Sequence, residues 1–134
     1  MLEPLAVELA VPTLTGAQLE ELERLHERHV DAPTSKGGAA AVPETNRAWH
    51  WAIYEASGWP ILNDLVRQLW EAFPWRTTWA LPGRRSLSLE QHEAVIVAIR
   101  AGDPALAAER MREHVTSGRE TLVAHLRSEL SPDG

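Results

Sequence analysis

Three histidines fall on the apolar stripes of three different predicted helices: His50, His92 and His114. A neutral imidazole among leucines and valines needs a partner for both ring nitrogens, which can be a hydrogen-bond network or a metal ion with an acceptor behind the ring. Inward side chains of facing helices build metal sites in helical bundles, so the three residues together predict a divalent metal centre. Separate, hydrogen-bonded core histidines are the alternative.

Asn46 extends this candidate site. It precedes His50 by four residues, so the two side chains share a helix face and can offer an oxygen and a nitrogen to one ion. The chain contains no cysteine, which excludes thiolate-bound zinc, iron–sulfur clusters and disulfides. Imidazole-rich sites favour Zn, Ni or similar borderline ions over Mg or Ca. The predicted cofactor is therefore a divalent metal of the Zn or Ni type.

The elements that position these residues are helical almost throughout, because apolar residues recur every three to four positions and no stretch alternates like a strand. We expect an all-α fold, an antiparallel bundle of about six helices over residues 1–130, with a disordered tail at 131–134. The predicted helices cover 1–10, about 15–30, about 44–57, 60–73, 88–101 and 103–128, and the main loops cover 31–43 and 81–87.

Helix boundaries are marked by local signals. The segments Thr15–Gln18 and Ser88–Gln91 read as capping boxes, and Asp103-Pro104 combines an N-cap residue with a proline at the first helical position. The fourth helix is predicted to bury Leu62, Leu65, Val66, Leu69 and Phe73. Arg84 and Arg85 lie in a Pro-Gly loop and are expected at the surface. His26 and His29 lack a third ligand and are not assigned to a metal site.

Composition limits the function classes. The chain of 134 residues carries a net charge of −6, which disfavours a surface that neutralises nucleic-acid phosphates. The longest apolar run, 94–99, is far shorter than the roughly 20 residues that span a bilayer, and the first ten residues contain no Lys or Arg. We therefore expect a soluble cytoplasmic protein with no membrane contact and no direct DNA contact.

Three segments of the chain form a recognisable set: LEPLAVELAV, NRAWHWAIYEASGWPIL and EQHEAVIVAIRAGDPALAAERMREHV. Over about residues 1–128 they resemble the FadR C-terminal domain, or FCD domain, of GntR-family bacterial transcriptional regulators. In metal-binding members of that family, an Asp and three His hold a divalent ion beneath a small-molecule cavity. Position by position, the resemblance implies that Asn46 takes the place of the Asp. It implies that His50, His92 and His114 are the three His ligands. Asn46 brings no negative charge, so weaker metal binding is expected, and an anionic effector could supply the missing charge.

The resemblance also suggests residues that contact an effector. Arg76 lies where family members often carry an Arg just after the fourth helix, and it could clamp a carboxylate in bidentate fashion. Trp49 and Trp79 belong to a set of six tryptophans between positions 49 and 79, and could narrow a cavity so that it selects an apolar or flat ligand. A solvated arginine and ordinary tryptophan packing are the alternatives.

The function implied by the resemblance is an effector-sensing and dimerising module that binds a small organic acid. Family members carry a winged helix-turn-helix domain before this one, whereas this chain starts with Met1 at the sensing domain's first helix. It is expected to be either a fragment or a stand-alone sensor. A His-metal-dependent enzyme is one alternative, since three histidines with an open position also hold catalytic zinc. Inward carboxylates are scarce, so no enzyme is expected. The other alternative is a metal-free structural or interaction module.

Overall fold

The computed structural model describes residues 1–32 and 41–131, and leaves the side chains of residues 41–43 and 76 undescribed. Every regular element in this part of the chain is helical, which confirms the all-α prediction. The elements are α1 (Leu2–Ala10), η1 (Val11–Thr13), α2 (Gly16–Asp31), α3 (Ala41–Ala56), α4 (Pro60–Ala72), α5 (Trp75–Trp79), α6 (Arg84–Arg100) and α7 (Pro104–Leu130).

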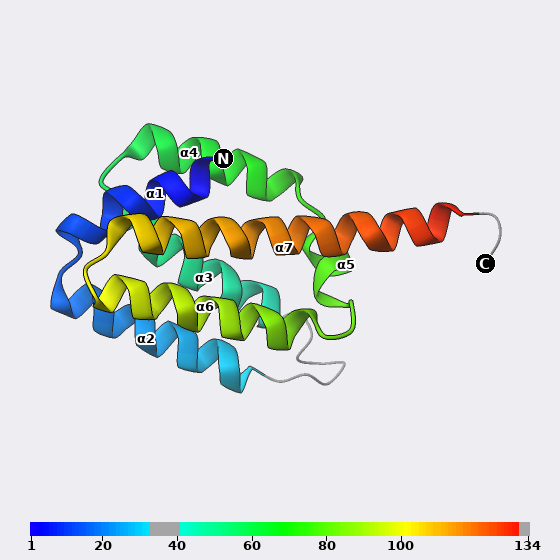
Figure 1. Ribbon diagram of the computed structural model, residues 1–134, viewed down its shortest axis with the longest axis horizontal. Coiled ribbons are helices and arrows are strands. Elements are labelled where there is room, and N and C mark those ends of the chain that lie inside the picture. The colour runs from blue at the N-terminus through cyan, green and yellow to red at the C-terminus, as the bar shows by residue number, and fades with distance from the viewer. Residues whose placement is uncertain (33–40, 132–134) are drawn as a thin grey trace.

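The helices pack around α7, which runs the length of the molecule and projects beyond the other helices at its C-terminal end (Figure 1). Helices α1 and α6 both pack on α7, α2 packs on α3 and α6, and α4 lies outside α1. The predicted shared face of Asn46 and His50 is confirmed, because both are buried on the inner stripe of α3, together with Trp49 and Ile53. The core therefore lies where α1, α3, α6 and α7 meet.

Several boundary signals act as predicted. The Thr15 hydroxyl accepts from the backbone N–H of Gln18, whose side chain accepts from Thr15 N–H, completing the capping box of α2. Asp103 accepts from the N–H of Leu106 at 3.0 Å, so that it caps α7. Gly102 at φ 68° turns the chain from α6 into α7, a left-handed conformation that favours glycine.

The start of α6 differs from the prediction. The helix begins at Arg84 instead of Ser88, with the left-handed Gly83 (φ 75°) as its N-cap residue, so most of the loop predicted at 81–87 is helical. No glycine or proline follows Gly83 to interrupt the helix, and Ser88 is buried within it. Similarly, α3 begins at Ala41, with Pro43 in a first turn that does not need its N–H. Residues 33–40 of the first predicted loop lie outside the described residues, as do residues 132–134 of the predicted tail.

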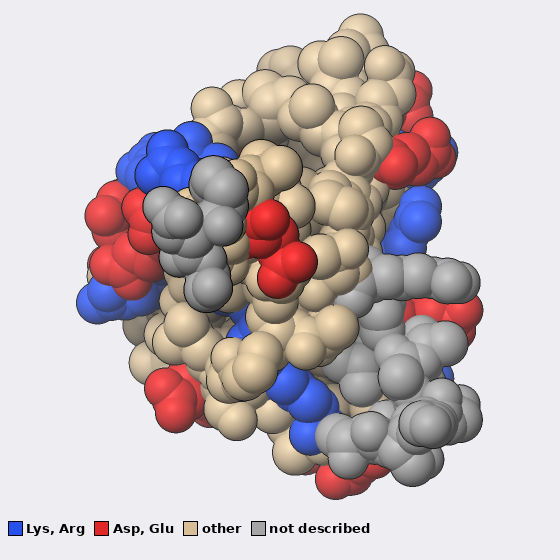
Figure 2. Space-filling view, turned by 90° about the vertical axis from the view of Figure 1, so that its right-hand side faces the viewer, with Lys and Arg blue, Asp and Glu red and all other residues tan. Residues whose placement is uncertain are grey.

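Helix α4 buries less than its sequence predicts. Leu65 and Leu69 were expected in the core, but they are 45% and 59% exposed, and the helix buries Leu62, Val66 and Trp70. The reason is geometric, because among the described residues α4 packs mainly on α1 and less closely on α3. Its exposed apolar side forms much of the uncharged upper surface in Figure 2. None of the described helices is long and apolar enough to cross a bilayer.

Candidate metal centre and adjoining cavity

The three predicted histidines converge inside the bundle. His50 comes from α3, His92 from α6 and His114 from α7, and all three are buried. The Nε2 atom of His114 lies 3.2 Å from Nε2 of His92 and 3.2 Å from Nε2 of His50. The ligand atoms of all three lie within 4.8 Å of one another. The cluster has the composition and compactness of a site for one divalent ion.

A chain of hydrogen bonds sets the tautomer of His50. The Tyr54 hydroxyl donates its single proton to Oε1 of Glu3 at 2.6 Å, and it lies 2.8 Å from Nδ1 of His50. With the tyrosine proton committed to Glu3, Nδ1 of His50 must carry the proton and donate it to the Tyr54 oxygen. The Nε2 atom of His50 is then a lone pair that points toward the other two histidines.

His114 is held in the same way. Its Nδ1 lies 2.9 Å from Oε1 of Gln91, and an amide oxygen only accepts, so Nδ1 carries the proton. Its Nε2 is therefore also a lone pair. His92 differs, because its Nδ1 is buried and has no hydrogen-bond partner, while its ring stacks on Trp49 with centroids 3.8 Å apart.

Two lone pairs thus face each other between His50 and His114, with no proton between them. Protonation does not relieve this contact, because burial lowers the pKa of His114 to about 3 and lowers that of His50 well below its usual value. The pKa of His92 is also well below its usual value, again chiefly through burial. Neutral imidazoles with converging lone pairs have the protonation state that metal binding requires.

Asn46 gives an independent test of whether the residues fit a metal ion. It is buried, and its Oδ1 atom has no hydrogen-bond partner among the described residues, which is costly for an amide oxygen. It lies one helical turn before His50, on the same buried stripe. Three imidazole nitrogens and an orphaned amide oxygen make a donor set that suits Zn or Ni, so the residues fit the group.

A cavity of about 280 Å³ opens beside this cluster. His50 and His114 form part of its wall, Glu3 is the one carboxylate among the described residues that line it, and Arg84 is one of its two guanidinium groups. The other lining residues are Leu69, Trp70, Phe73, Trp75, Val115, Gly118 and Arg119. Burial raises the pKa of Glu3, although hydrogen bonds from Tyr54 and Trp70 oppose the shift. The cavity thus joins the histidine cluster to a largely aromatic space.

Arg84 corrects a prediction, because it is buried instead of lying at the surface. Its Nη1 donates to the Ser117 hydroxyl at 3.2 Å, and its buried Nε has no partner. Within the described residues, no carboxylate forms an ion pair with it. Gly118 leaves space for the guanidinium, since a Cβ there would lie 3.2 Å from Nη2. A buried, uncompensated cation at a cavity wall can bind an anion.

None of the residues predicted to contact an effector, which are Trp49, Trp79 and Arg76, is among the described residues that line the cavity. Trp49 is fully buried behind the cluster, stacked on His92. Trp79 lies edge-on to His29, with ring centroids 5.4 Å apart. Neither is among the lining residues of the cavity, whose indole rings belong to Trp70 and Trp75. Arg76 falls in α5, and its side chain lies outside the described residues.

Glu3 and His29 are site residues that the sequence analysis missed. His29 is fully buried, its ring centroid lies 5.4 Å from that of His92, and burial lowers its pKa to about 4. The spacing of Leu22, Leu25 and His29 along α2 places all three on its buried stripe, which is the signal that could have identified His29. No comparable signal identifies Glu3, which lies among apolar residues at the start of α1.

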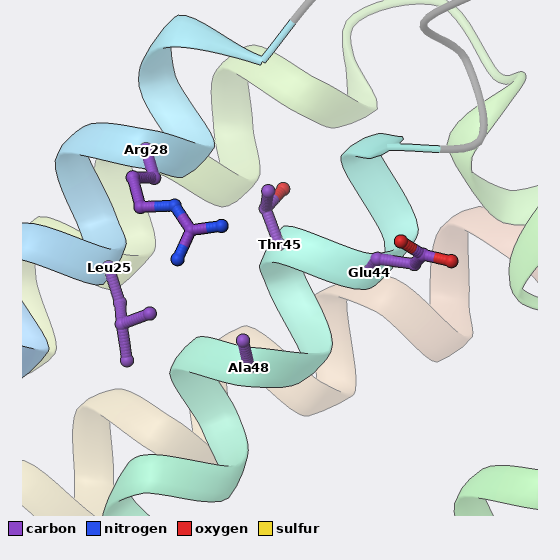
Figure 3. Close-up of a pocket in the computed structure, with 5 residues that line it drawn as sticks. All are labelled: Leu25, Arg28, Glu44, Thr45 and Ala48. Carbon is purple, nitrogen blue, oxygen red and sulfur yellow. The ribbon is translucent and has the colours of Figure 1, made fainter.

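A second hollow, of about 320 Å³, lies between α2 and α3 (Figure 3). It is lined by Leu25, Arg28, Glu44, Thr45 and Ala48, and the Glu44 carboxylate points away from Arg28. It contains none of the clustered histidines. We therefore regard the smaller cavity beside the histidines as the functional site, because of these two it is the one that joins buried histidines, a carboxyl group and a buried guanidinium.

Comparison with known families agrees with this architecture. A family model described as the FCD domain matches residues 1–117. The solved structure of Escherichia coli McbR/YncC superposes with a TM-score of 0.81 and 28% sequence identity, over 93% of this chain and 60% of that one.

Two curated relatives are named as transcriptional regulators. The HTH-type transcriptional regulator McbR of Escherichia coli (strain K12) is 42% identical over 69 residues, which are 52% of this chain and 31% of that protein. The putative transcriptional regulatory protein NedR of Micromonospora viridifaciens is 30% identical over 92 residues, or 63% of each chain. The chain thus spans less than two thirds of the length of each relative.

Proposed function

Because the chain belongs to the FCD domain family, we propose that it is the effector-sensing domain of a transcriptional regulator of the GntR/FadR type. In this proposal the cavity beside His50 and His114 binds a small organic acid over a divalent metal ion. The observation that carries the proposal is the meeting of two features in one cavity. These are the histidine nitrogens that lack a proton between them and the buried guanidinium of Arg84, which forms no ion pair with any described carboxylate.

The metal would be held by His50, His92 and His114, with Asn46 as the oxygen donor. When bound, it supplies a positive, Lewis-acidic centre at the cavity wall. The chain's own residues do the positioning: Tyr54 and Gln91 hold the rings of His50 and His114 by their Nδ1 atoms. Because all four ligands are neutral, the centre keeps its full charge and favours an anionic effector.

Arg84 would take the role that the sequence analysis gave to Arg76. Its guanidinium already lines the cavity and lacks an anionic partner, and a carboxylate can satisfy two of its N–H groups at once. An effector bound there would contact α6 through Arg84 and α7 through His114 and Gly118. Such an effector shifts helix packing only by as much as its affinity differs between the two packings.

A metal-dependent hydrolase is the alternative from a different class, and Glu3 is the observation that favours it. Its pKa is raised by burial and it lines the same cavity as the histidines. However, Oε1 of Glu3 already accepts hydrogen bonds from the Tyr54 hydroxyl and from Nε1 of Trp70, so this oxygen fixes the positions of two residues of the site. We therefore assign Glu3 to the support of His50 and propose no enzymatic activity.

We also propose that the chain forms a homodimer through the exposed side of α4. Ile61, Leu65 and Leu69 are spaced four residues apart and are 78%, 45% and 59% exposed. An apolar stripe of this kind on the surface is a common mark of a protein–protein contact. Sedimentation or light scattering of wild type and Leu65→Glu tests this, and a monomer in both would contradict it.

The sensor proposal is tested by the thermal stability of the untagged protein against a panel of small carboxylates, with added Zn²⁺ or with chelator. We expect carboxylates to raise the melting temperature of the zinc-loaded protein, with a smaller effect after chelation. Arg84→Gln should abolish the carboxylate response. Turnover of a panel compound would favour the enzyme alternative, and no response to any carboxylate would contradict the sensor.

A further inference from the structure

One wall of the cavity is built from aromatic rings, and one of them, Trp70, lies edge-on to His50 with ring centroids 4.9 Å apart. Trp70 and Trp75 have ring centroids 4.2 Å apart, and Phe73 lies 4.4 Å from Trp75. Leu69 and Val115 extend the same apolar surface. These rings come from the end of α4, the turn after it and α5, so that one short stretch of chain supplies the wall.

The indole N–H groups of this wall are already used. Nε1 of Trp75 donates to the backbone oxygen of Trp70 at 2.8 Å, and Nε1 of Trp70 donates to Oε1 of Glu3 at 2.8 Å. The rings therefore present carbon surface to the cavity and no hydrogen-bond donor. Aromatic faces of this kind bind flat apolar groups through area burial and offset stacking.

Two cations line the cavity, Arg84 from α6 and Arg119 from α7. A ligand with one carboxylate can place it against Arg84 and the histidine cluster and direct the rest of its body toward the rings. A second carboxylate paired with Arg119, which is exposed, would stay in water and gain little. Directed at the rings or at Glu3, it would face aromatic carbon or another carboxyl group. There it would lose hydration without gaining a partner.

We propose that this cavity selects monocarboxylates with an aromatic body over small aliphatic acids and dicarboxylates. The inference rests on the proposed function, since it takes Arg84 to be the carboxylate anchor. It adds that Trp70, Phe73 and Trp75 determine specificity through contact with the ligand's ring.

Three probes with related head groups test the proposal by calorimetric titration of the zinc-loaded, untagged chain: acetate, phenylacetate and succinate. We expect phenylacetate to bind about tenfold or more tightly than acetate, which is the scale for burying one phenyl ring. Succinate should bind no more tightly than acetate. Equal binding of acetate and phenylacetate, or tighter binding of succinate, would overturn the selectivity.

Variants identify the wall as the source of selectivity. Trp75→Ala should bring the affinity for phenylacetate close to that for acetate, while far-UV circular dichroism and Zn²⁺ titration report whether the fold is intact. Trp59→Ala, which removes an exposed indole outside the cavity, is the matched control and should keep the preference. Phe73→Ala provides a second test if Trp75→Ala does not fold, and a preference that survives these wall substitutions would overturn the proposal. Failure of all three probes to bind instead contradicts the proposed function itself.

Discussion

The Nε2 atoms of His50 and His114 lie 3.2 Å apart, and neither nitrogen carries a proton. Each ring commits its proton to a partner on the opposite side, His50 to Tyr54 and His114 to Gln91. Two acceptors held this close repel each other unless a cation lies between them. A metal ion bound by these nitrogens would relieve this repulsion, and the proposed site has consequences that can be measured.

Asn46→Asp should tighten metal binding, because it adds a negative charge to a set of neutral ligands. We expect a dissociation constant for Zn²⁺ lower by about tenfold or more, measured in competition with a chelator. Asn63→Asp makes the same charge change on α4 and should have no such effect. An unchanged affinity in Asn46→Asp would mean that position 46 does not face the ion.

Tyr54→Phe should weaken metal binding although residue 54 is not a ligand. The substitution removes the oxygen that accepts the Nδ1 proton of His50 and also the donor to Glu3. Loss of such an outer partner typically costs about 10- to 100-fold in metal affinity. Trp51→Phe, another aromatic change on α3, is the control. Zinc affinity equal to that of wild type would show that the Glu3–Tyr54 chain does not support His50.

The stability of the metal-free protein should fall in mild acid. Burial lowers the pKa of His114 to about 3, whereas a histidine in the unfolded chain titrates near ~6.5. Between these values the unfolded chain binds a proton that the folded chain does not, so the free energy of unfolding decreases as the pH falls.

His50 and His92 add to this effect, since burial also lowers their pKa values. Each histidine contributes a slope of up to about 1.4 kcal/mol per pH unit below ~6.5. Urea denaturation at several pH values between 7.5 and 5 measures the slope, and His114→Gln should reduce it. His125 lies outside the cluster, so His125→Gln serves as the control. Equal stability across this range would contradict burial of neutral imidazoles.

Gly118→Ala should weaken carboxylate binding while it changes the stability of the fold only slightly. Alanine is favoured over glycine in a helix by about 0.8–1.0 kcal/mol, but its Cβ would crowd Nη2 of Arg84 at 3.2 Å. We expect a change in the free energy of unfolding of less than about 1 kcal/mol, together with several-fold weaker acetate binding to the zinc-loaded protein. Gly16→Ala has open space around it and should leave acetate binding unchanged. Wild-type acetate affinity in Gly118→Ala would argue against Arg84 as the anchor.

The sequence predicted those parts of the fold that depend on local periodicity. The inner stripe of α3, the capping box of α2 and the N-cap of α7 follow from residues within one or two turns of each other. The convergence of His50, His92 and His114 was also predictable, because each lies on the apolar face of its own helix.

Features that depend on packing between distant segments were not predictable in this way. The sequence analysis predicted Arg84 in a surface loop. Its burial depends on the space that Gly118 leaves on α7, which is 34 residues away in the chain and gives no local signal. Leu65 and Leu69 were predicted to be buried, because periodicity does not distinguish a core stripe from an exposed apolar one. Glu3 carries no local signal, since its partners Tyr54 and Trp70 are 51 and 67 residues away in the chain.

Titration of Zn²⁺ into untagged, metal-free protein tests the central claim most directly. The account predicts one ion per chain, bound by wild type and lost in His114→Ala, the histidine whose Nε2 contacts both of the others. Absence of a saturable single site, or equal zinc affinity in wild type and His114→Ala, would contradict it.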